Sequence, residues 1–239
     1  MLTFSEADLY APIKAHFESL GYAVKGEVKG CDMILSKDDN HFAVELKKSF
    51  NITLLYQALD RAKLTNGAYV AIPRSIYMKK RGHITHILEK LEIGLITVAM
   101  DSPLKSVAVH LAPNIGKTRN NARSRALVAE LNGRNFDGNI GGAVKQKLLT
   151  AHRERILHIA CVLEKLEVAS AATLVGLYDC HKLTSQWLRR NYYGWFDKVE
   201  TGRYALSQAG RAALADPWFS EIVGYYRECI NAEYQKQSE

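Results

Sequence analysis

One short segment of the chain combines an acid and a base in the alternation expected of a β-strand. In HFAVELKK (residues 41–48), successive side chains point to opposite faces, so Glu45 and Lys47 share one face. Placing a carboxylate and an ammonium in an otherwise apolar strand costs free energy unless they pair with each other or with an ion. The segment therefore indicates either a solvated cross-strand ion pair or part of a catalytic site.

An upstream aspartate completes a candidate metal site. Residues 31–37 form a second extended run, and Lys37-Asp38-Asp39-Asn40 is typical of a turn between two strands. A hairpin centred on this turn places Asp32 directly opposite Glu45, with Cβ atoms about 5 Å apart. Two facing carboxylates repel each other unless a cation lies between them, and Mg²⁺, or alternatively Mn²⁺, suits such oxygen ligands.

A metal ion held in this way would support phosphodiester hydrolysis. It would polarise a phosphoryl oxygen and acidify a bound water molecule, which makes a nucleophile near neutral pH. Lys47 would either orient that water or offset the charge that grows on the phosphate. The sequence leaves both roles of Lys47 open.

The elements that must position these residues form a mixed α/β domain over residues 1–112. Apolar periodicity and turn residues predict helices and strands in the order α-β-β-β-α-β-α-β-β, which indicates a mixed central sheet with helices on its faces. The expected helices cover residues 9–20, 52–64 and 79–92, and the expected strands cover 22–28, 31–37, 41–48, 67–73, 94–100 and 106–111.

The remaining residues divide into a connector and a second domain. Residues 113–147 are expected to form a basic connector with a short helix over 124–134. Residues 148–239 are expected to form three helices followed by a hairpin around Thr201-Gly202, the pattern of a winged helix-turn-helix. A last amphipathic helix over 219–234 either packs on its own domain or forms a homodimer.

The motif around the candidate site is similar to that of a known superfamily. Asp32 followed by Glu45-Leu46-Lys47 in a helix-plus-hairpin frame resembles the PD-(D/E)XK nucleases, although Cys31 stands where proline usually precedes the aspartate. The segments SEADLYAPIKAHFESLGYAVKGEVKGCDM, YQALDRAKLT, NFDGNIGG and KLLTAHRERILHIA resemble an uncharacterised bacterial group described as phosphodiesterases of this superfamily. The resemblance implies an αβββαβ nuclease-like core and metal-dependent phosphodiester hydrolysis, and it brings no established substrate.

The resemblance also implies two further site residues. It places a metal-site glutamate of the first helix at Glu6 and a site glutamine at Gln57. Glu6 continues the inward face formed by Leu9 and Ile13. However, Thr3-Phe4-Ser5-Glu6 also matches a capping box, in which Glu6 satisfies only the backbone. Gln57 also fits a surface or interhelical hydrogen bond.

Basic and polar side chains form a candidate nucleic-acid surface. Residues 114–147 hold seven basic and two acidic side chains, which accounts for most of the net charge of +7. In the third helix of the second domain, Trp187, Leu188 and Tyr192 are expected to pack inward. Residues 148–239 hold eleven side chains of each sign, and this balance also fits a protein–protein platform. The expected contact residues are Arg119, Arg123, Arg125, Thr184, Ser185, Gln186, Arg189, Arg190, Lys198 and Arg203.

Composition excludes several other classes of protein. No apolar stretch approaches the roughly 18 residues of a membrane span, and the acidic Glu6 and Asp8 do not fit a signal peptide. The four cysteines are scattered, so we expect no zinc or disulfide framework and a cytoplasmic location. We therefore predict a metal-dependent nuclease that acts on nucleic acid, with DNA as the first candidate. The alternatives are a non-catalytic DNA-binding or regulatory protein on a nuclease-like scaffold, and a phosphodiesterase for other phosphate esters.

Overall fold

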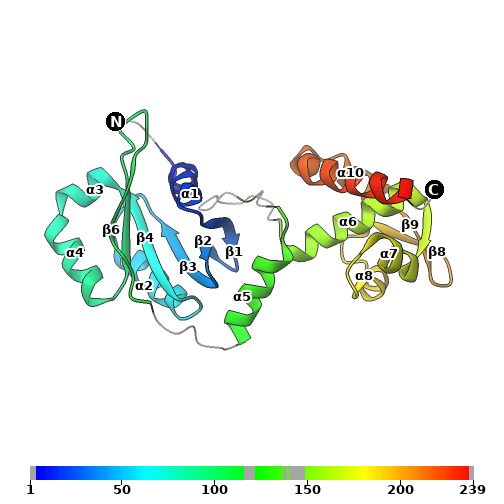
Figure 1. Ribbon diagram of the computed structural model, residues 1–239, viewed down its shortest axis with the longest axis horizontal. Coiled ribbons are helices and arrows are strands. Elements are labelled where there is room, and N and C mark those ends of the chain that lie inside the picture. The colour runs from blue at the N-terminus through cyan, green and yellow to red at the C-terminus, as the bar shows by residue number, and fades with distance from the viewer. Residues whose placement is uncertain (1–3, 116–121, 137–138, 140–148, 237–239) are drawn as a thin grey trace. The chain divides into compact units, whose positions relative to one another are not determined.

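The chain forms two compact units, Met1–Leu149 and Thr150–Glu239. The structure is a computed structural model that describes residues 4–115, 122–136, 139 and 149–236 (Figure 1). None of the helices in these described ranges has the length and apolar character needed to cross a membrane.

The first unit is built on a six-stranded mixed sheet with the strand order β1-β2-β3-β4-β5-β6 (Figure 1). Its first three strands form an antiparallel meander, β3, β4 and β5 are parallel, and β6 is antiparallel to β5. This mixed sheet fits a nuclease-like core. The strands are β1 (Ala23–Val28), β2 (Cys31–Lys37), β3 (Asn40–Leu46), β4 (Gly67–Pro73), β5 (Gly94–Val98) and β6 (Val107–Leu111).

Helices cover both faces of this sheet. On one face Ile13 and Phe17 of α1 pack with Val44 of β3, and on the other Leu54 of α2 packs with Val70 of β4. Every residue of β4 and β5 is buried, as expected for parallel strands covered on both faces. The helices are η1 (Ala7–Leu9), α1 (Tyr10–Ser19), α2 (Ile52–Ala62), α3 (Arg74–Lys79), α4 (Arg81–Lys90) and α5 (Ala122–Gly133).

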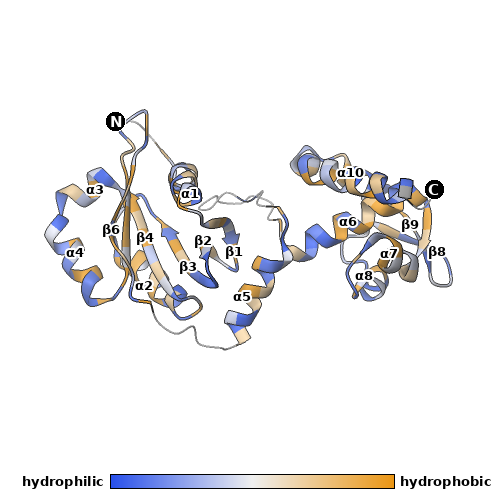
Figure 2. Cartoon of the chain, in the orientation of Figure 1, coloured by the Kyte–Doolittle hydropathy of each residue, from blue (hydrophilic) through white to orange (hydrophobic). Residues whose placement is uncertain are grey.

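The helix predicted over residues 79–92 is present as α4, and a second helix that was not predicted, α3, precedes it. α3 starts directly after Pro73, and the backbone leaves the helical conformation at Lys80 before α4 begins. α3 is too short for its apolar periodicity to be visible in the sequence. Figure 2 shows hydrophobic residues along the central strands and hydrophilic ones along much of α3 and α4.

The short helix of the predicted connector, α5, packs on the first unit. Ser124 Oγ donates a hydrogen bond to the Leu64 carbonyl at 3.0 Å, and Lys25 Nζ donates to the carbonyls of Leu131 and Arg134, each at 2.6 Å. The buried Arg134 guanidinium in turn donates to the Gly26 carbonyl at 2.8 Å. These bonds tie residues 122–134 to β1 and to the end of α2.

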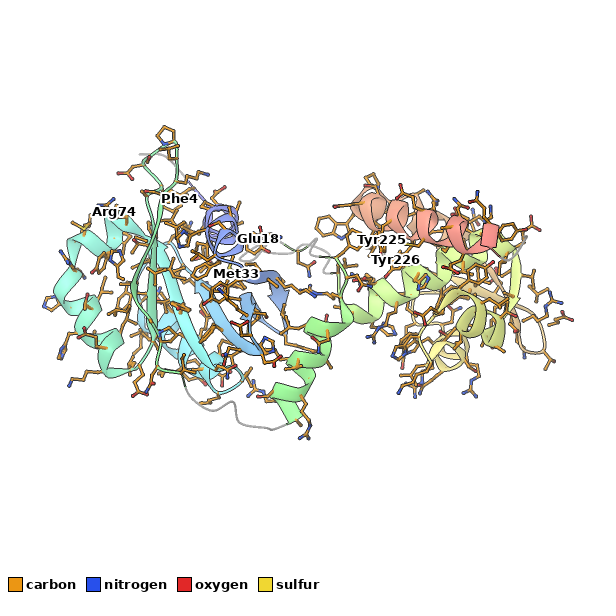
Figure 3. The ribbon with its side chains drawn as sticks, in the orientation of Figure 1. Phe4, Glu18, Met33, Arg74, Tyr225 and Tyr226 are labelled. Carbon is orange, nitrogen blue, oxygen red and sulfur yellow. The ribbon has the colours of Figure 1, made fainter. Side chains whose placement is uncertain are left out.

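The second unit has a small three-stranded sheet with the order β7-β9-β8. β7 was not predicted, because three residues are too few to show alternation. The final helix packs on α6 of the same unit, where Tyr226 Oη (labelled in Figure 3) donates to the buried Glu154 carboxylate at 3.0 Å. The elements are α6 (Ala151–Leu166), β7 (Val168–Ser170), α7 (Ala171–Tyr178), α8 (Thr184–Arg190), β8 (Phe196–Glu200), β9 (Arg203–Leu206), α9 (Gln208–Leu214), η2 (Pro217–Phe219) and α10 (Ser220–Lys236).

Candidate active site

The β2–β3 hairpin has the register predicted from the sequence. Lys37 pairs with Asn40, and the ladder continues to the pair of Met33 with Val44. The two turn residues between the strands both have positive φ, 49° and 62°, as required by a two-residue type I′ turn. The next position along this ladder places Asp32 opposite Glu45.

Both acids of this pair are held inside the first unit. Glu45 is almost fully buried, at 1% exposure, and Asp32 is half-buried. The backbone N–H of Leu46 donates to Asp32 Oδ2 at 2.8 Å. This hydrogen bond fixes the Asp32 carboxylate at the carboxyl end of β3.

Lys47 follows β3 and meets a residue from the start of the chain. Its backbone N–H donates to the Ala71 carbonyl at 3.0 Å, and its Nζ lies 2.9 Å from Glu6 Oε2. The local hydrogen bonds at the helix start go to Asp8, whose Oδ2 accepts from both the N–H and the Oγ of Ser5, at 2.7 and 2.8 Å. Thr3 of the proposed capping box lies outside the described residues. The Glu6 carboxylate therefore joins the candidate site by its contact with Lys47.

Arg61 is a site residue that sequence reasoning missed. Its Nε lies 3.1 Å from Glu45 Oε1, its Nη2 donates to the Gly30 carbonyl at 2.6 Å, and its Nη1 lies 3.3 Å from Asp60 Oδ2. The available signal was its spacing, because Arg61 continues the buried stripe of Leu54 and Ala58 on α2. A basic residue on the inward stripe of a helix requires a buried acid or carbonyl as its partner.

Gln57 lies one helical turn before Arg61, on the same face of α2. Its Oε1 is buried and accepts no hydrogen bond from the part of the chain that the structure describes. An unsatisfied buried amide oxygen costs about 1–3 kcal/mol. It also provides an oxygen ligand of the type that hard cations take.

The electrostatics of the site favour added positive charge. Burial, and then the charge of Asp32, raise the pKa of Glu45 to about 7, even though Arg61 acts in the opposite direction. Burial also raises the pKa of Asp32, against the lowering effects of the Leu46 N–H and Lys47. Burial lowers the pKa of Lys47, but its hydrogen bond to Glu6 and the surrounding carboxylates raise it overall. Lys47 is therefore a cation at neutral pH, which suits charge compensation better than proton abstraction.

The expected metal ligands are only partly brought together. Over the described ranges, no three or more His, Cys, Asp or Glu side chains converge to hold a metal ion. Glu6 contacts Lys47 instead of joining Asp32 and Glu45 as a third ligand. The donor set that fits a hard cation is the facing pair of carboxylates, because Mg²⁺ is bound by one or two carboxylates together with water and phosphate oxygens.

The expected nucleic-acid contacts are mostly at the surface. Ser185, Arg189, Arg190 and Lys198 are exposed, and Gln186 is half-buried. Arg203 is exposed and forms an ion pair with Glu200 at 3.1 Å. In the first unit, Arg123 and Arg125 are exposed on α5, and Arg119 lies outside the described residues.

Two expectations for the third helix, α8, were wrong. Thr184 is fully buried and its Oγ1 donates to the His181 carbonyl at 2.6 Å, so its side chain is not available to a ligand. Tyr192, expected to pack inward, is 65% exposed because Asn191 ends the helix in the left-handed conformation. Trp187 and Leu188 are buried as predicted.

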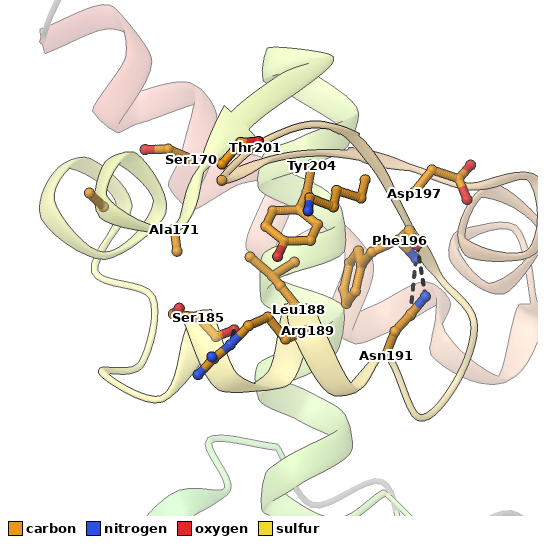
Figure 4. Close-up of a pocket in the computed structure, with 13 residues that line it drawn as sticks. Ser170, Ala171, Ser185, Leu188, Arg189, Asn191, Phe196, Asp197, Thr201 and Tyr204 are labelled. Carbon is orange, nitrogen blue, oxygen red and sulfur yellow. Dashed lines mark hydrogen bonds between the residues drawn. The ribbon is translucent and has the colours of Figure 1, made fainter.

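A groove of about 900 Å³ lies between α8, the start of α7 and the β8–β9 hairpin (Figure 4). Ser185 and Arg189 line it from α8, and Lys198 and Thr201 line it from the hairpin. Asn191 holds the hairpin side of the groove. Its Nδ2 donates to the Phe196 carbonyl at 2.7 Å, and its Oδ1 accepts a hydrogen bond from the Phe196 N–H at 3.2 Å.

Comparisons with known proteins agree with the resemblance seen in the sequence. Residues 96–213 match the model of a family described as "Putative PD-(D/E)XK phosphodiesterase (DUF2161)", a segment that excludes Asp32, Glu45 and Lys47. A solved structure, the SPO1766 protein of unknown function from Silicibacter pomeroyi, is 14% identical with a TM-score of 0.38, over 53% of this chain and 84% of that one. A similarity at this level supports no functional argument. No curated protein matches the chain.

Proposed function

Because the resemblance to the PD-(D/E)XK phosphodiesterases is confirmed over residues 96–213, we propose that the chain is a metal-dependent nuclease that hydrolyses phosphodiester bonds of nucleic acid, with DNA as the first candidate. One observation carries the proposal. The register of β2 and β3, continued by one position, puts Asp32 opposite the buried Glu45, and both acids act on the ammonium of Lys47.

The residues of the site have distinct roles in this proposal. Asp32 and Glu45 would hold Mg²⁺, or alternatively Mn²⁺, and the Gln57 amide oxygen supplies a further neutral ligand from α2. The metal ion, when bound, would polarise the phosphoryl oxygen and acidify the attacking water. Lys47 offsets the charge that develops on the phosphate, and Glu6 holds the Lys47 ammonium in place.

We propose that the second unit is a winged helix that positions the DNA. Its order of helix, short strand, two helices and hairpin is typical of this motif, and α8 stands in the place of the recognition helix. Arg189 and Lys198 line opposite sides of the groove beside α8, where they would contact phosphates. Supercoiled or linear duplex DNA is therefore the first substrate to test.

A non-catalytic DNA-binding protein is the second candidate function. The observation that favours it is that Glu45 and Lys47 each have a protein partner of opposite charge, Arg61 and Glu6 respectively. In that case the acids and bases of the site would serve only stability.

A cleavage assay separates the candidates. The protein is incubated with supercoiled, linear, branched and single-stranded DNA and with RNA, in magnesium, manganese or chelator. Glu45→Gln and Lys47→Gln are tested beside Lys48→Gln, a matched change of the adjacent exposed lysine. Metal-dependent cutting that falls about 100-fold or more in the first two variants only supports the nuclease.

Other outcomes of this assay contradict the proposal. Tight DNA binding with no cutting of any substrate would favour the non-catalytic protein. Cleavage of small phosphodiesters without cleavage of nucleic acid would indicate a different phosphate ester as the substrate.

A further inference from the structure

The first unit has a strongly basic surface that the proposed active site does not use. Residues 74–90 contain five basic and one acidic side chain, whereas the rest of residues 1–113 contains nine basic and eleven acidic ones. Four residues of this surface, which we call the basic ridge, are Arg74 at the start of α3 and Lys79, Lys80 and Arg81 at the α3–α4 junction. All four side chains are exposed.

The four cations of the basic ridge have no acidic partners among the described residues. None of them takes part in an ion pair there, in contrast to Lys14, Lys29 and Lys63, which each lie within 4.0 Å of a carboxylate. Keeping like charges together without counter-charges opposes the compact fold, so a clustered, unpaired set is suited to a partner with negative charge.

The basic ridge is held on a rigid part of the fold. Tyr77 of α3 is buried, its Oη lies 3.3 Å from Thr85 Oγ1 of α4, and its ring centroid lies 4.5 Å from that of His110 on β6. Burial, and then the charges of Arg81 and Arg74, lower the pKa of His110, so both arginines act on this one side chain of β6. The two arginines therefore share one region of the surface.

The basic ridge begins at the carboxyl ends of the parallel strands, where the candidate active site also lies. β3 and β4 are parallel, Leu46 pairs with Ala71, and the N–H of Lys47 donates to the Ala71 carbonyl. Arg74, labelled in Figure 3, follows only three residues after Ala71 and opens α3. In sheets of this kind, ligands bind at the carboxyl ends of parallel strands.

We propose that the basic ridge binds the phosphate backbone of a nucleic-acid strand that runs past the site of Asp32 and Glu45. The inference rests on the proposed function and adds the substrate class, a polymer with phosphates beyond the scissile one. A small phosphodiester would reach the site but would leave these four cations without contacts. A cluster of exposed, unpaired cations suits contact with phosphates, and such contacts carry no base sequence information.

The test measures binding to a fluorescein-labelled DNA duplex by anisotropy, in calcium so that cutting is suppressed, over a series of salt concentrations. The triple variant Lys79→Gln, Lys80→Gln, Arg81→Gln is compared with the matched control Lys14→Gln, Lys29→Gln, Lys63→Gln, which removes the same charge from the same unit. Thermal unfolding of both variants verifies that they are folded.

We expect the ridge variant to lose affinity about tenfold or more and its log–log salt slope to fall by about 2 to 3, because each lost phosphate contact removes about 0.9 from the slope. The control variant is expected to keep the slope of the wild type. Equal affinity and equal slope for the two triple variants would contradict the proposed role of the basic ridge in binding nucleic acid.

A second readout keeps this inference distinct from the proposed function. With manganese, the ratio of duplex cleavage to bis(p-nitrophenyl) phosphate hydrolysis is expected to fall in the ridge variant and not in the control. If Glu45-dependent cutting is present but the ratio stays constant, the proposed role of the basic ridge is wrong, and the proposed nuclease function is retained. If the wild type cuts nothing, the proposed nuclease function is wrong. The salt slope alone then tests whether the basic ridge binds nucleic acid.

Discussion

The guanidinium of Arg61 lies against the carboxylate of Glu45, with 3.1 Å between Nε and Oε1. A second contact, 2.6 Å from Nη2 to the Gly30 carbonyl, fixes the guanidinium on the side of β2. Arg61 thus supplies positive charge to an acid that is 1% exposed and that faces Asp32. A metal ion that binds Glu45 has to share its carboxylate with Arg61 or displace the guanidinium. The Arg61–Glu45 pair therefore links metal binding to the stability of the first unit.

Replacing Arg61 is expected to destabilise the metal-free protein. In Arg61→Gln the buried Glu45 loses its charged partner, so we expect the free energy of unfolding to fall by about 1–3 kcal/mol. Added magnesium is expected to recover part of the loss, because it supplies the missing positive charge. Urea denaturation with and without magnesium measures both effects, and Lys63→Gln serves as the exposed control. An unchanged free energy of unfolding would show that the pair has no role in stability.

The raised pKa of Glu45 predicts a dependence of stability on pH. The folded-state pKa is about 7 and the ordinary value is 4.5, so between these values the folded protein holds a proton that the unfolded chain releases. The stability of the wild type is therefore expected to fall as pH rises from about 4.5 to about 7, and to level off above that. The full effect is at most about 3 kcal/mol.

Glu45→Gln removes this titration and provides the reference for it. Denaturation midpoints of both proteins, measured through this pH range without metal, are expected to shift in favour of the variant as pH rises. A difference between the two proteins that stays constant with pH would contradict the raised pKa.

The Glu6–Lys47 contact predicts a positioning role for Glu6. Loss of the Lys47 ammonium is expected to lower kcat about 100-fold or more, and Glu6→Gln is expected to lower it less, because the ammonium remains but is held loosely. Glu6→Gln is also expected to lower the pKa of Lys47, which NMR titration of the side-chain amine measures. A Glu6→Gln enzyme with full kcat and an unshifted Lys47 would leave Glu6 with a role only in the helix start.

The proposed winged helix predicts unequal effects for two arginines. Arg189 lines the groove, and its Nε donates to the backbone carbonyl of Ser185 at 3.4 Å, whereas Arg203 is paired with Glu200. We expect Arg189→Gln to weaken DNA binding and to reduce the salt slope by about 1. Arg203→Gln is expected to have a smaller effect. Anisotropy titrations of both variants test this order, and the reverse order would contradict the placement of DNA in the groove.

Local sequence was sufficient to predict the hairpin that carries the candidate site. The Asp38-Asp39 turn determines the hairpin register, and the two-residue period of the strands then places Asp32 opposite Glu45 on one face. The order of most helices and strands in both units followed from periodicity for the same reason. Neighbouring residues along the chain carry all the information that such patterns need.

Contacts between distant segments were decided only by the tertiary structure. Arg61 reaches Glu45 and Glu6 reaches Lys47 because helices pack on particular faces of the sheet. Spacing along the chain indicates that Arg61 and Glu6 point inward, but it does not specify their partners. The burial of Thr184 and the attachment of α5 to the first unit have the same origin. The sequence thus determined the facing acids, and the packing of α2 and η1 decided which charges compensate them, since such partners depend on distance in space.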